Sequence, residues 1–309
     1  MKIVKKILRW LILGGTLFFL GKALKDHWTE VSAIQIDAAG WAILTVATGV
    51  TLLAHTWAGW IWTWVLKELN QSVSASQFIQ VYLKTNIAKY LPGNIWHYYG
   101  RILAAKNAEI PTGAATLSVL LEPLLMAAAA LIIVVLFGGN LAVKHTNLGV
   151  FFLQLLILGL IIIAVHPWFL NPVIGLLYKL KNKKSADQNP SDFSLSLERY
   201  PLRPLLGELG FIGLRGTGFI LTVFALSSIN FNQIPLLLSA FSFAWLLGLV
   251  VPGAPGGLGV FEATAIALLQ NRFPVALVIS AIALYRLISI LAETAGAALA
   301  WLDERWTNN

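Results

Sequence analysis

Long apolar segments alternate with short polar connections along most of the chain, and their lengths predict helices that cross a membrane. Six segments approach or exceed the roughly 20 residues that a helix needs to cross the hydrocarbon core of a bilayer. They are residues 7–24, 40–66, 111–137, 149–167, 204–229 and 273–302. We therefore predict about six full transmembrane helices.

Two further apolar segments are interrupted by proline and glycine. Residues 76–105 contain "YLPGN", and residues 235–269 contain "VVPGAPGGLG". Proline removes a backbone donor and glycine loosens a helix, so each segment should form a helix, a break and a second helix. Because the pieces beside each break are too short to cross the bilayer comfortably, we predict two re-entrant hairpins. The second segment could instead form two short spans, which would give eight crossings.

The first apolar run follows a basic start, "MKIVKK", which is typical either of a cleavable signal peptide or of an uncut first helix. No cleavage site of small residues follows the run, which favours the uncut helix. Lys and Arg collect in cytoplasmic loops, so this start places the N-terminus in the cytoplasm. Counting spans then places residues 67–106, the loop at 181–203 and the C-terminus on the same side.

This topology makes the first hairpin enter from the cytoplasm and the second from the outside. Two interrupted segments at corresponding positions of two halves are typical of an inverted repeat, which places a substrate site near the membrane midplane. We assign the first repeat to residues 40–167, the cytoplasmic loop to 181–203 and the second repeat to 204–302, within one membrane domain covering 1–309. The alternative is that both breaks are packing kinks without a transport role.

Composition agrees with an all-α polytopic membrane protein. The 309 residues are 58% hydrophobic and only 12% charged, whereas soluble domains carry about 25% charged residues. Twelve Trp residues suit the membrane interfaces, where an indole ring is apolar at one end and wet at the other. The chain has no Cys, which excludes disulfides, thiol chemistry and Cys-based metal sites.

Several ionisable side chains fall within predicted apolar helices or just after the second break, among them Glu122, Arg215, Glu262, Arg286 and Glu293. Each charge costs roughly 2.5–3.5 kcal/mol at the bilayer centre, so these groups must pair between helices or face a wet cavity. Arg286 and Glu293 share a helix face, but a rise of about 10 Å separates them. We therefore expect each to find a partner on another helix, with Glu122 and Glu262 as candidate partners for the arginines.

The first break lies in a basic and aromatic segment, "AKYLPGNIWHYYGR", at residues 88–101. A helix N-terminus exposed at the break would bind an anion through its amides. Lys89 and Arg101 add positive charge, and Arg binds phosphate through two parallel hydrogen bonds. This combination predicts a site for the phosphate of a lipid head. The alternative is a basic helix that lies on an anionic leaflet.

Motifs for nucleotide binding and catalysis are absent from the sequence. It contains no G-x-x-x-x-G-K-[ST] loop, no H-E-x-x-H motif and no serine in a nucleophile elbow. The five His residues show no ligand spacing, and His55, in the middle of a span, is expected to be a neutral core residue. We therefore expect no cofactor, no metal, no catalytic residue and no nucleic-acid partner.

Two stretches resemble the lysylphosphatidylglycerol synthase transmembrane family, the flippase-like domain of multiple peptide resistance factors. They are "YLPGNIWHYYGRILAAKNAEIPTGAATLSVLLEPLL" and, downstream, "VPGAPGGLGVFEATAIALL". By position, the resemblance implicates in the first stretch Pro92, Gly93, Asn94, Arg101 and Glu122. In the second stretch and the helix after it, the resemblance implicates Pro252, Pro255, Gly256, Gly257, Gly259, Glu262 and Arg286.

The resemblance implies that the chain moves a polar lipid head between leaflets. Fused family members also carry a soluble aminoacyl-transferase domain, which these residues do not include, so we expect a stand-alone flippase or scramblase rather than an enzyme. The predicted headgroup path combines three cations that attract phosphate with four groups that line it: Lys89, Arg101 and Arg215, then Glu122, Glu262, Arg286 and Glu293.

The expected ligand is a membrane phospholipid or a polyprenyl-phosphate glycolipid of the inner (plasma) membrane. One alternative is a membrane subunit or scaffold for a glycosyltransferase or lipid-modifying enzyme encoded elsewhere, which would tolerate Arg101→Ala in lipid transport. Another is a membrane-embedded transferase, whose product would vanish with Glu122→Gln or Glu262→Gln.

Overall fold

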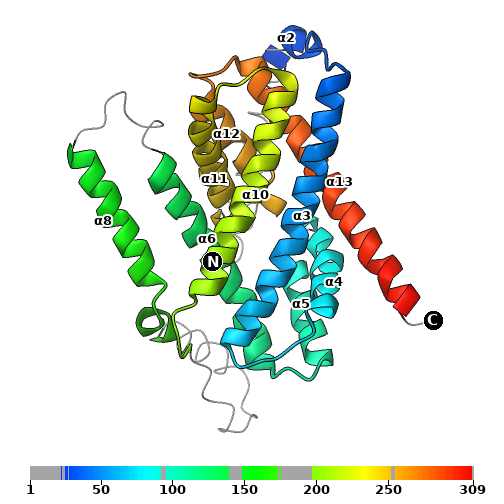
Figure 1. The fold of residues 1–309 in the computed structure, drawn as a ribbon, viewed down its shortest axis with the longest axis vertical. Coiled ribbons are helices and arrows are strands. Elements are labelled where there is room, and N and C mark those ends of the chain that lie inside the picture. The colour runs from blue at the N-terminus through cyan, green and yellow to red at the C-terminus, as the bar shows by residue number, and fades with distance from the viewer. Residues whose placement is uncertain are drawn as a thin grey trace, which may run out of the picture.

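The computed structural model describes residues 22, 25–26, 28–91, 95–138, 148–172, 175, 197–251 and 255–307. All regular structure in these residues is helical (Figure 1). Five of the described helices are long and apolar enough to cross a membrane. They are α3 (Ala38–Glu68), α6 (Thr112–Phe137), α10 (Leu202–Leu226), α11 (Ile234–Val250) with the turn η3 (Phe231–Gln233) before it, and α13 (Val275–Thr307). The prediction of an all-α polytopic membrane protein is confirmed.

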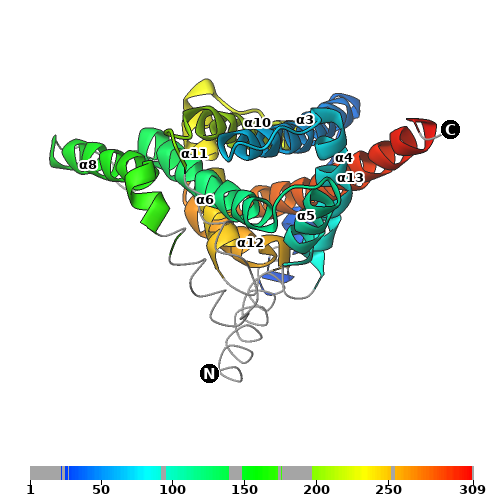
Figure 2. The ribbon, with the colours of Figure 1, turned by 90° about the horizontal axis from the view of Figure 1, so that it is seen from below.

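Four predicted spans coincide with α3, α6, α10 and α13. The span predicted at 7–24 lies outside the described residues, apart from Lys22. The span predicted at 149–167 corresponds to α8 (Leu148–Ala164), whose 17 residues rise about 25 Å and are shorter than the other spans. α8 packs mainly against α6 and stands apart from the remaining helices (Figure 2).

Each interrupted segment folds as a helix, a break and a second helix. The first consists of α4 (Ala75–Asn86), the turn η1 (Ile87–Tyr90) and α5 (Trp96–Asn107). The second consists of α11, the turn η4 (Pro255–Gly257) and α12 (Val260–Leu269). The hairpins lie towards opposite ends of the bundle, and their breaks meet inside it, where η1 contacts η4 (Figure 1).

The helix before each break ends for the same reason. Leu91 has φ −69° and ψ 147°, and Val251 has φ −70° and ψ 117°. In the sequence each is followed by proline, whose ring disfavours the helical conformation at the preceding residue. The two prolines therefore determine where both helices stop.

One arm of the second hairpin is longer than predicted. We expected both pieces beside this break to be too short to cross the bilayer, but η3 and α11 together cover Phe231–Val250, 20 residues that are apolar enough to span it. The added turn is capped at its start, because the Asn230 amide donates a hydrogen bond of 2.9 Å to Gln233 Oε1. α12, with 10 residues, is the short arm.

Two units with the same element order run in opposite directions through the bundle. One is α3, the first hairpin and α6, and the other is α10, the second hairpin and α13 (Figure 1). α3 and α10 pack closely: a Cβ at Gly218 would lie 2.6 Å from Thr51 Oγ1, and one at Gly207 would lie 2.9 Å from Ile61 Cγ1. Small residues allow such close approach of helices in a membrane. This contact brings His55 of α3 beside Arg215 of α10.

Candidate functional site

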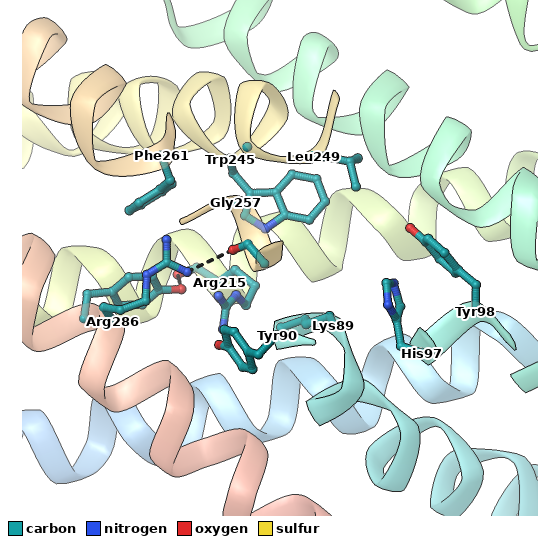
Figure 3. Close-up of a pocket in the computed structure, with 13 residues that line it drawn as sticks. Lys89, Tyr90, His97, Tyr98, Arg215, Trp245, Leu249, Gly257, Phe261 and Arg286 are labelled. Carbon is teal, nitrogen blue, oxygen red and sulfur yellow. Dashed lines mark hydrogen bonds between the residues drawn. The ribbon is translucent and has the colours of Figure 1, made fainter. Parts of the chain in front are cut away.

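A polar cavity lies where the two breaks meet. Its volume is about 110 Å³, whereas a single water needs about 10–15 Å³ of such space, so it has room for several waters or a phosphate group. Side chains from both hairpins, α10 and α13 surround it (Figure 3). The polar ones include Lys89, Tyr90, His97, Arg215, Tyr285 and Arg286.

Glycines of the second break bring the two hairpins into contact. Gly256 has φ +59° and Gly257 has φ +72°, conformations that glycine adopts without the cost that a Cβ imposes. A Cβ at Gly256 would lie 2.8 Å from Cε1 of Tyr90, and one at Gly257 would lie 3.2 Å from Cα of Gly248. The turn η4 can therefore sit directly against the Tyr90 ring of the first hairpin and against α11.

An ion pair fixes the second break to the last helix. Arg286 Nε donates a hydrogen bond of 2.7 Å to Glu262 Oε1. Arg286 Nη1 donates one of 3.1 Å to the carbonyl of Gly256 (Figure 3). The other oxygen of Glu262 accepts a 2.6 Å hydrogen bond from the Gly259 amide. Glu262 therefore neutralises Arg286 and also caps the start of α12.

A second acid, Glu293 of α13, binds the first break. Its Oε1 lies 2.6 Å from Lys89 Nζ and 3.1 Å from His55 Nε2. A carboxylate oxygen at that distance requires a hydrogen on Nε2, and His55 Nδ1 then accepts from the Asn86 side chain, 3.3 Å away. The histidine is thus a buried, hydrogen-bonded link between α3, the first hairpin and α13.

Arg215 has no carboxylate partner among the described residues. Its Nη1 lies 3.1 Å from His55 Nε2, but this nitrogen already carries a hydrogen and cannot accept one. Its Nε has no hydrogen-bond partner, and its guanidinium carbon lies 5.2 Å from the centre of the Tyr285 ring. Tyr285 also donates a 3.0 Å hydrogen bond to the Arg215 carbonyl. The guanidinium is therefore held at the cavity without being neutralised there.

Among the described residues, the charges around the cavity do not balance. Three cations, Lys89, Arg215 and Arg286, face two carboxylates, Glu262 and Glu293. With His55 neutral, the group carries one excess positive charge. An arrangement of this kind attracts an anion.

Arg101 and Glu122 form a separate ion pair, and neither residue lines the cavity. Arg101 Nη1 lies 2.9 and 3.1 Å from the two oxygens of Glu122, and both side chains are almost fully buried. The guanidinium carbon lies 3.6 Å from the centre of the Tyr82 ring. The structure therefore places Arg101 as a paired and covered cation, whereas we expected it to face the phosphate.

The remaining predicted site residues fall into two groups. Pro255 and Gly259 lie at the second break, beside the glycines that line the cavity. Four lie outside the described residues: Pro92, Gly93, Asn94 and Pro252. The seven-residue spacing of Arg286 and Glu293 correctly predicted that each would pair with a different helix.

Sequence reasoning left three residues out of the site: His55, which it expected to be a neutral core residue, Asn86 and Glu208. His55 and Asn86 complete the network around Glu293, but neither carries a formal charge that would mark it within an apolar segment. Glu208 is fully buried on α10, and neither of its carboxyl oxygens has a hydrogen-bond partner among the described residues. A signal for Glu208 was present, because it precedes Arg215 by seven positions and so lies on the same face of a predicted span.

Within the described ranges, no group of three or more His, Cys, Asp or Glu side chains is arranged to hold a metal ion. A family model described as "Lysylphosphatidylglycerol synthase TM region" matches residues 6–296. A comparison with curated proteins finds no match for this chain.

Proposed function

Because the chain belongs to the lysylphosphatidylglycerol synthase transmembrane-region family, we propose that it is a flippase or scramblase that moves a phosphate-bearing lipid head between leaflets. Family membership implies a lipid-related role in a membrane. The proposal adds the process itself: this chain binds a headgroup and lets it pass between leaflets, and it forms or breaks no covalent bond.

The excess positive charge at the cavity is the observation that carries this proposal. A phosphodiester bears one negative charge, which would neutralise the group formed by Lys89, Arg215 and Arg286 with their two acids. Arg215 offers a planar pair of donors for two phosphate oxygens. No carboxylate of the described residues pairs with it, and its Nε, which has no hydrogen-bond partner there, can donate to the ligand.

The two hairpins provide a mechanism by which the cavity opens to one leaflet and then to the other. We infer that they are re-entrant, the first from the cytoplasmic face and the second from the outer face of the inner membrane, with both termini cytoplasmic. Sites built from broken helices at the midplane, between inverted units, are typical of transporters that work by alternating access. Movement of either hairpin against the other would expose the phosphate site to one leaflet at a time.

The proposed ligand is a membrane phospholipid or a polyprenyl-phosphate glycolipid, since both present the same phosphate chemistry to Arg215. The cavity has room for the phosphate rather than for a whole oligosaccharide head. The remainder of a large head would have to lie in a path that opens when the hairpins move. No enzymatic activity and no nucleic-acid partner form part of the proposal.

Replacement of Arg215 tests the proposal. The full chain is reconstituted in liposomes with headgroup-labelled phospholipids, and translocation is measured by quenching of label in the outer leaflet. A charge-assisted hydrogen bond contributes about 1.5–3 kcal/mol, so Arg215→Gln should slow translocation by roughly 10- to 100-fold. Arg215→Lys should retain part of the rate, because it keeps the charge but loses the paired donors.

Arg305→Gln is the matched control, because Arg305 is exposed at the end of α13, over the Trp301 ring, far along the helix from the cavity. It should translocate lipid at the wild-type rate. Equal rates for Arg215→Gln and the wild type would contradict the proposal. A wild-type protein that leaves translocation at the protein-free rate, but copurifies with a lipid-modifying enzyme, would support the role of a membrane subunit instead.

A further inference from the structure

A second buried carboxyl group lies beside the Arg101–Glu122 pair. Glu208 is fully buried, and both its oxygens lack a hydrogen-bond partner among the described residues. The titratable groups that interact with it there are Glu122 of α6, Arg101 of α5 and Tyr82 of α4. Helices α3, α11 and α13 also pack against α10, and their described residues add no further charge to this cluster.

Among the described residues, this cluster contains one guanidinium and two carboxyl groups. Arg101 Nη1 is bound to both oxygens of Glu122, at 2.9 and 3.1 Å, while its Nε has no partner. Tyr82 covers one face of the guanidinium at 3.6 Å. A second ionised carboxylate in this place would be buried without a compensating cation, and a group in that situation takes up a proton instead. Glu208 is therefore a neutral acid while Arg101 is bound to Glu122.

We propose that Glu208 and Glu122 form a proton-binding pair that holds one proton between them, on whichever carboxyl group Arg101 does not bind. Arg101 lies on α5, the returning arm of that hairpin, whereas Glu122 and Glu208 lie on the spans α6 and α10. When α5 shifts and Arg101 moves from Glu122 to Glu208, the O–H bond of Glu208 breaks and its proton passes to water. Glu122, now without its cation, takes one proton from water. No oxidant, reductant or other reactant is needed.

This proposal rests on the proposed function only where lipid movement is the readout. Proton binding itself can be followed by infrared spectroscopy of the purified full chain, through the carbonyl stretch of a protonated carboxylic acid at neutral pH. The wild type should show this band, and Glu208→Gln should lose it. Glu122→Gln should lose it too, because Arg101 is then free to bind Glu208, which ionises.

Glu304→Gln is the control for the infrared measurement, because Glu304 is partly exposed and paired with Lys84. It should leave the band unchanged. A band that persists in Glu208→Gln would assign the buried proton to another group. A band that persists in Glu122→Gln would show that Arg101 does not move to Glu208 when the Glu122 carboxylate is absent. Either outcome overturns the proposal.

Lipid movement is measured in liposomes that contain headgroup-labelled phospholipid and carry a gradient of about one pH unit. Because the exchange releases one proton for each proton that it takes up, the gradient should leave the inner-to-outer lipid ratio unchanged. One net coupled proton would instead change this ratio by up to about tenfold, and that result would contradict a one-for-one exchange. If the wild type moves no lipid, the proposed function fails while the infrared result stands.

Discussion

Arg101 is as deeply buried as the aliphatic core, and the structure compensates its charge with one partner. Glu122 accepts both of its short hydrogen bonds, and Tyr82 covers the guanidinium. Removing one member of a buried ion pair costs about 3–5 kcal/mol, because the other charge loses its compensation. Arg101→Met should therefore lower the free energy of unfolding by about that amount, measured by denaturant titration in detergent micelles.

A second substitution separates the cost of the lost partner from the cost of lost packing. Replacing a buried pair by apolar side chains of similar volume is often neutral, so Arg101→Met combined with Glu122→Leu should recover most of the lost stability. The difference between the double variant and the sum of the two single variants gives the coupling energy. Additive effects would mean that the two side chains do not depend on each other.

Buried charge was the most informative signal at the level of single residues. Arg215, Arg286 and Glu293 were recognisable because an ionised group inside an apolar span requires a partner or water, and the structure brings all three to one region. The choice of partners was not predictable, because it depends on which helices are neighbours. For the same reason the sequence did not show that Arg101 would be neutralised by Glu122, or that Arg215 would have no carboxylate partner in the part of the chain that the structure describes.

Gly256 gives a prediction at the level of the hairpins. Its φ of +59° and the 2.8 Å that would separate a Cβ from the Tyr90 ring both disfavour any other residue. A non-glycine residue in this conformation costs about 1–3 kcal/mol, and the clash would also push the two breaks apart. Gly256→Ala should therefore lower the midpoint of thermal unfolding and slow lipid translocation in liposomes.

Gly213→Ala serves as the comparison. Gly213 lies within α10, and nothing lies within 4 Å of a Cβ placed there. Alanine stabilises a helix interior by about 0.5–1 kcal/mol relative to glycine, so this variant should unfold at the same or a higher temperature and transport at the wild-type rate. If Gly256→Ala behaved like Gly213→Ala, direct contact between the breaks would not matter.

The elements themselves were largely predictable from apolar length and from proline. The helix before each break stops at a residue that is followed by proline, and four predicted spans coincide with helices. The length of α11 was underestimated, because the turn at Phe231–Gln233 extends it through a local cap that depends on side-chain geometry. Contact between the two breaks is a tertiary feature, and no local pattern in the sequence encodes it.

The two hairpins are held to the following spans by ion pairs of opposite polarity. In the first unit α5 supplies Arg101 and α6 supplies Glu122, whereas in the second α12 supplies Glu262 and α13 supplies Arg286. Each pair connects the returning arm of a hairpin to the next long helix. The first pair is enclosed and the second borders the cavity. The two hairpins therefore respond differently to a bound anion, which can compete for Arg286 but not for Arg101.

At the scale of the whole molecule, basic residues gather at the end that holds the first hairpin. Lys67, Lys106, Arg203 and Arg305 lie at helix termini on that side (Figure 1). At the other end, the described connections at residues 33–37, 227–230 and 270–274 contain one basic residue, Arg272, and Lys25 lies just before α2 (Trp28–Ser32). By the positive-inside rule, we predict that the basic end faces the cytoplasm.

Single cysteines test this orientation without background, because the chain has none of its own. Ser72 lies in the connection from α3 to α4 and Ser228 in the connection from α10 to α11, at opposite ends of the bundle, and both are exposed. A membrane-impermeant maleimide added to intact bacterial cells with a permeable outer membrane should modify Ser228→Cys and spare Ser72→Cys until the inner membrane is opened. The reverse labelling pattern would show that the protein has the opposite orientation in the membrane. Modification of both from one side would contradict hairpins that enter from opposite faces, and with it the alternating access on which lipid movement depends.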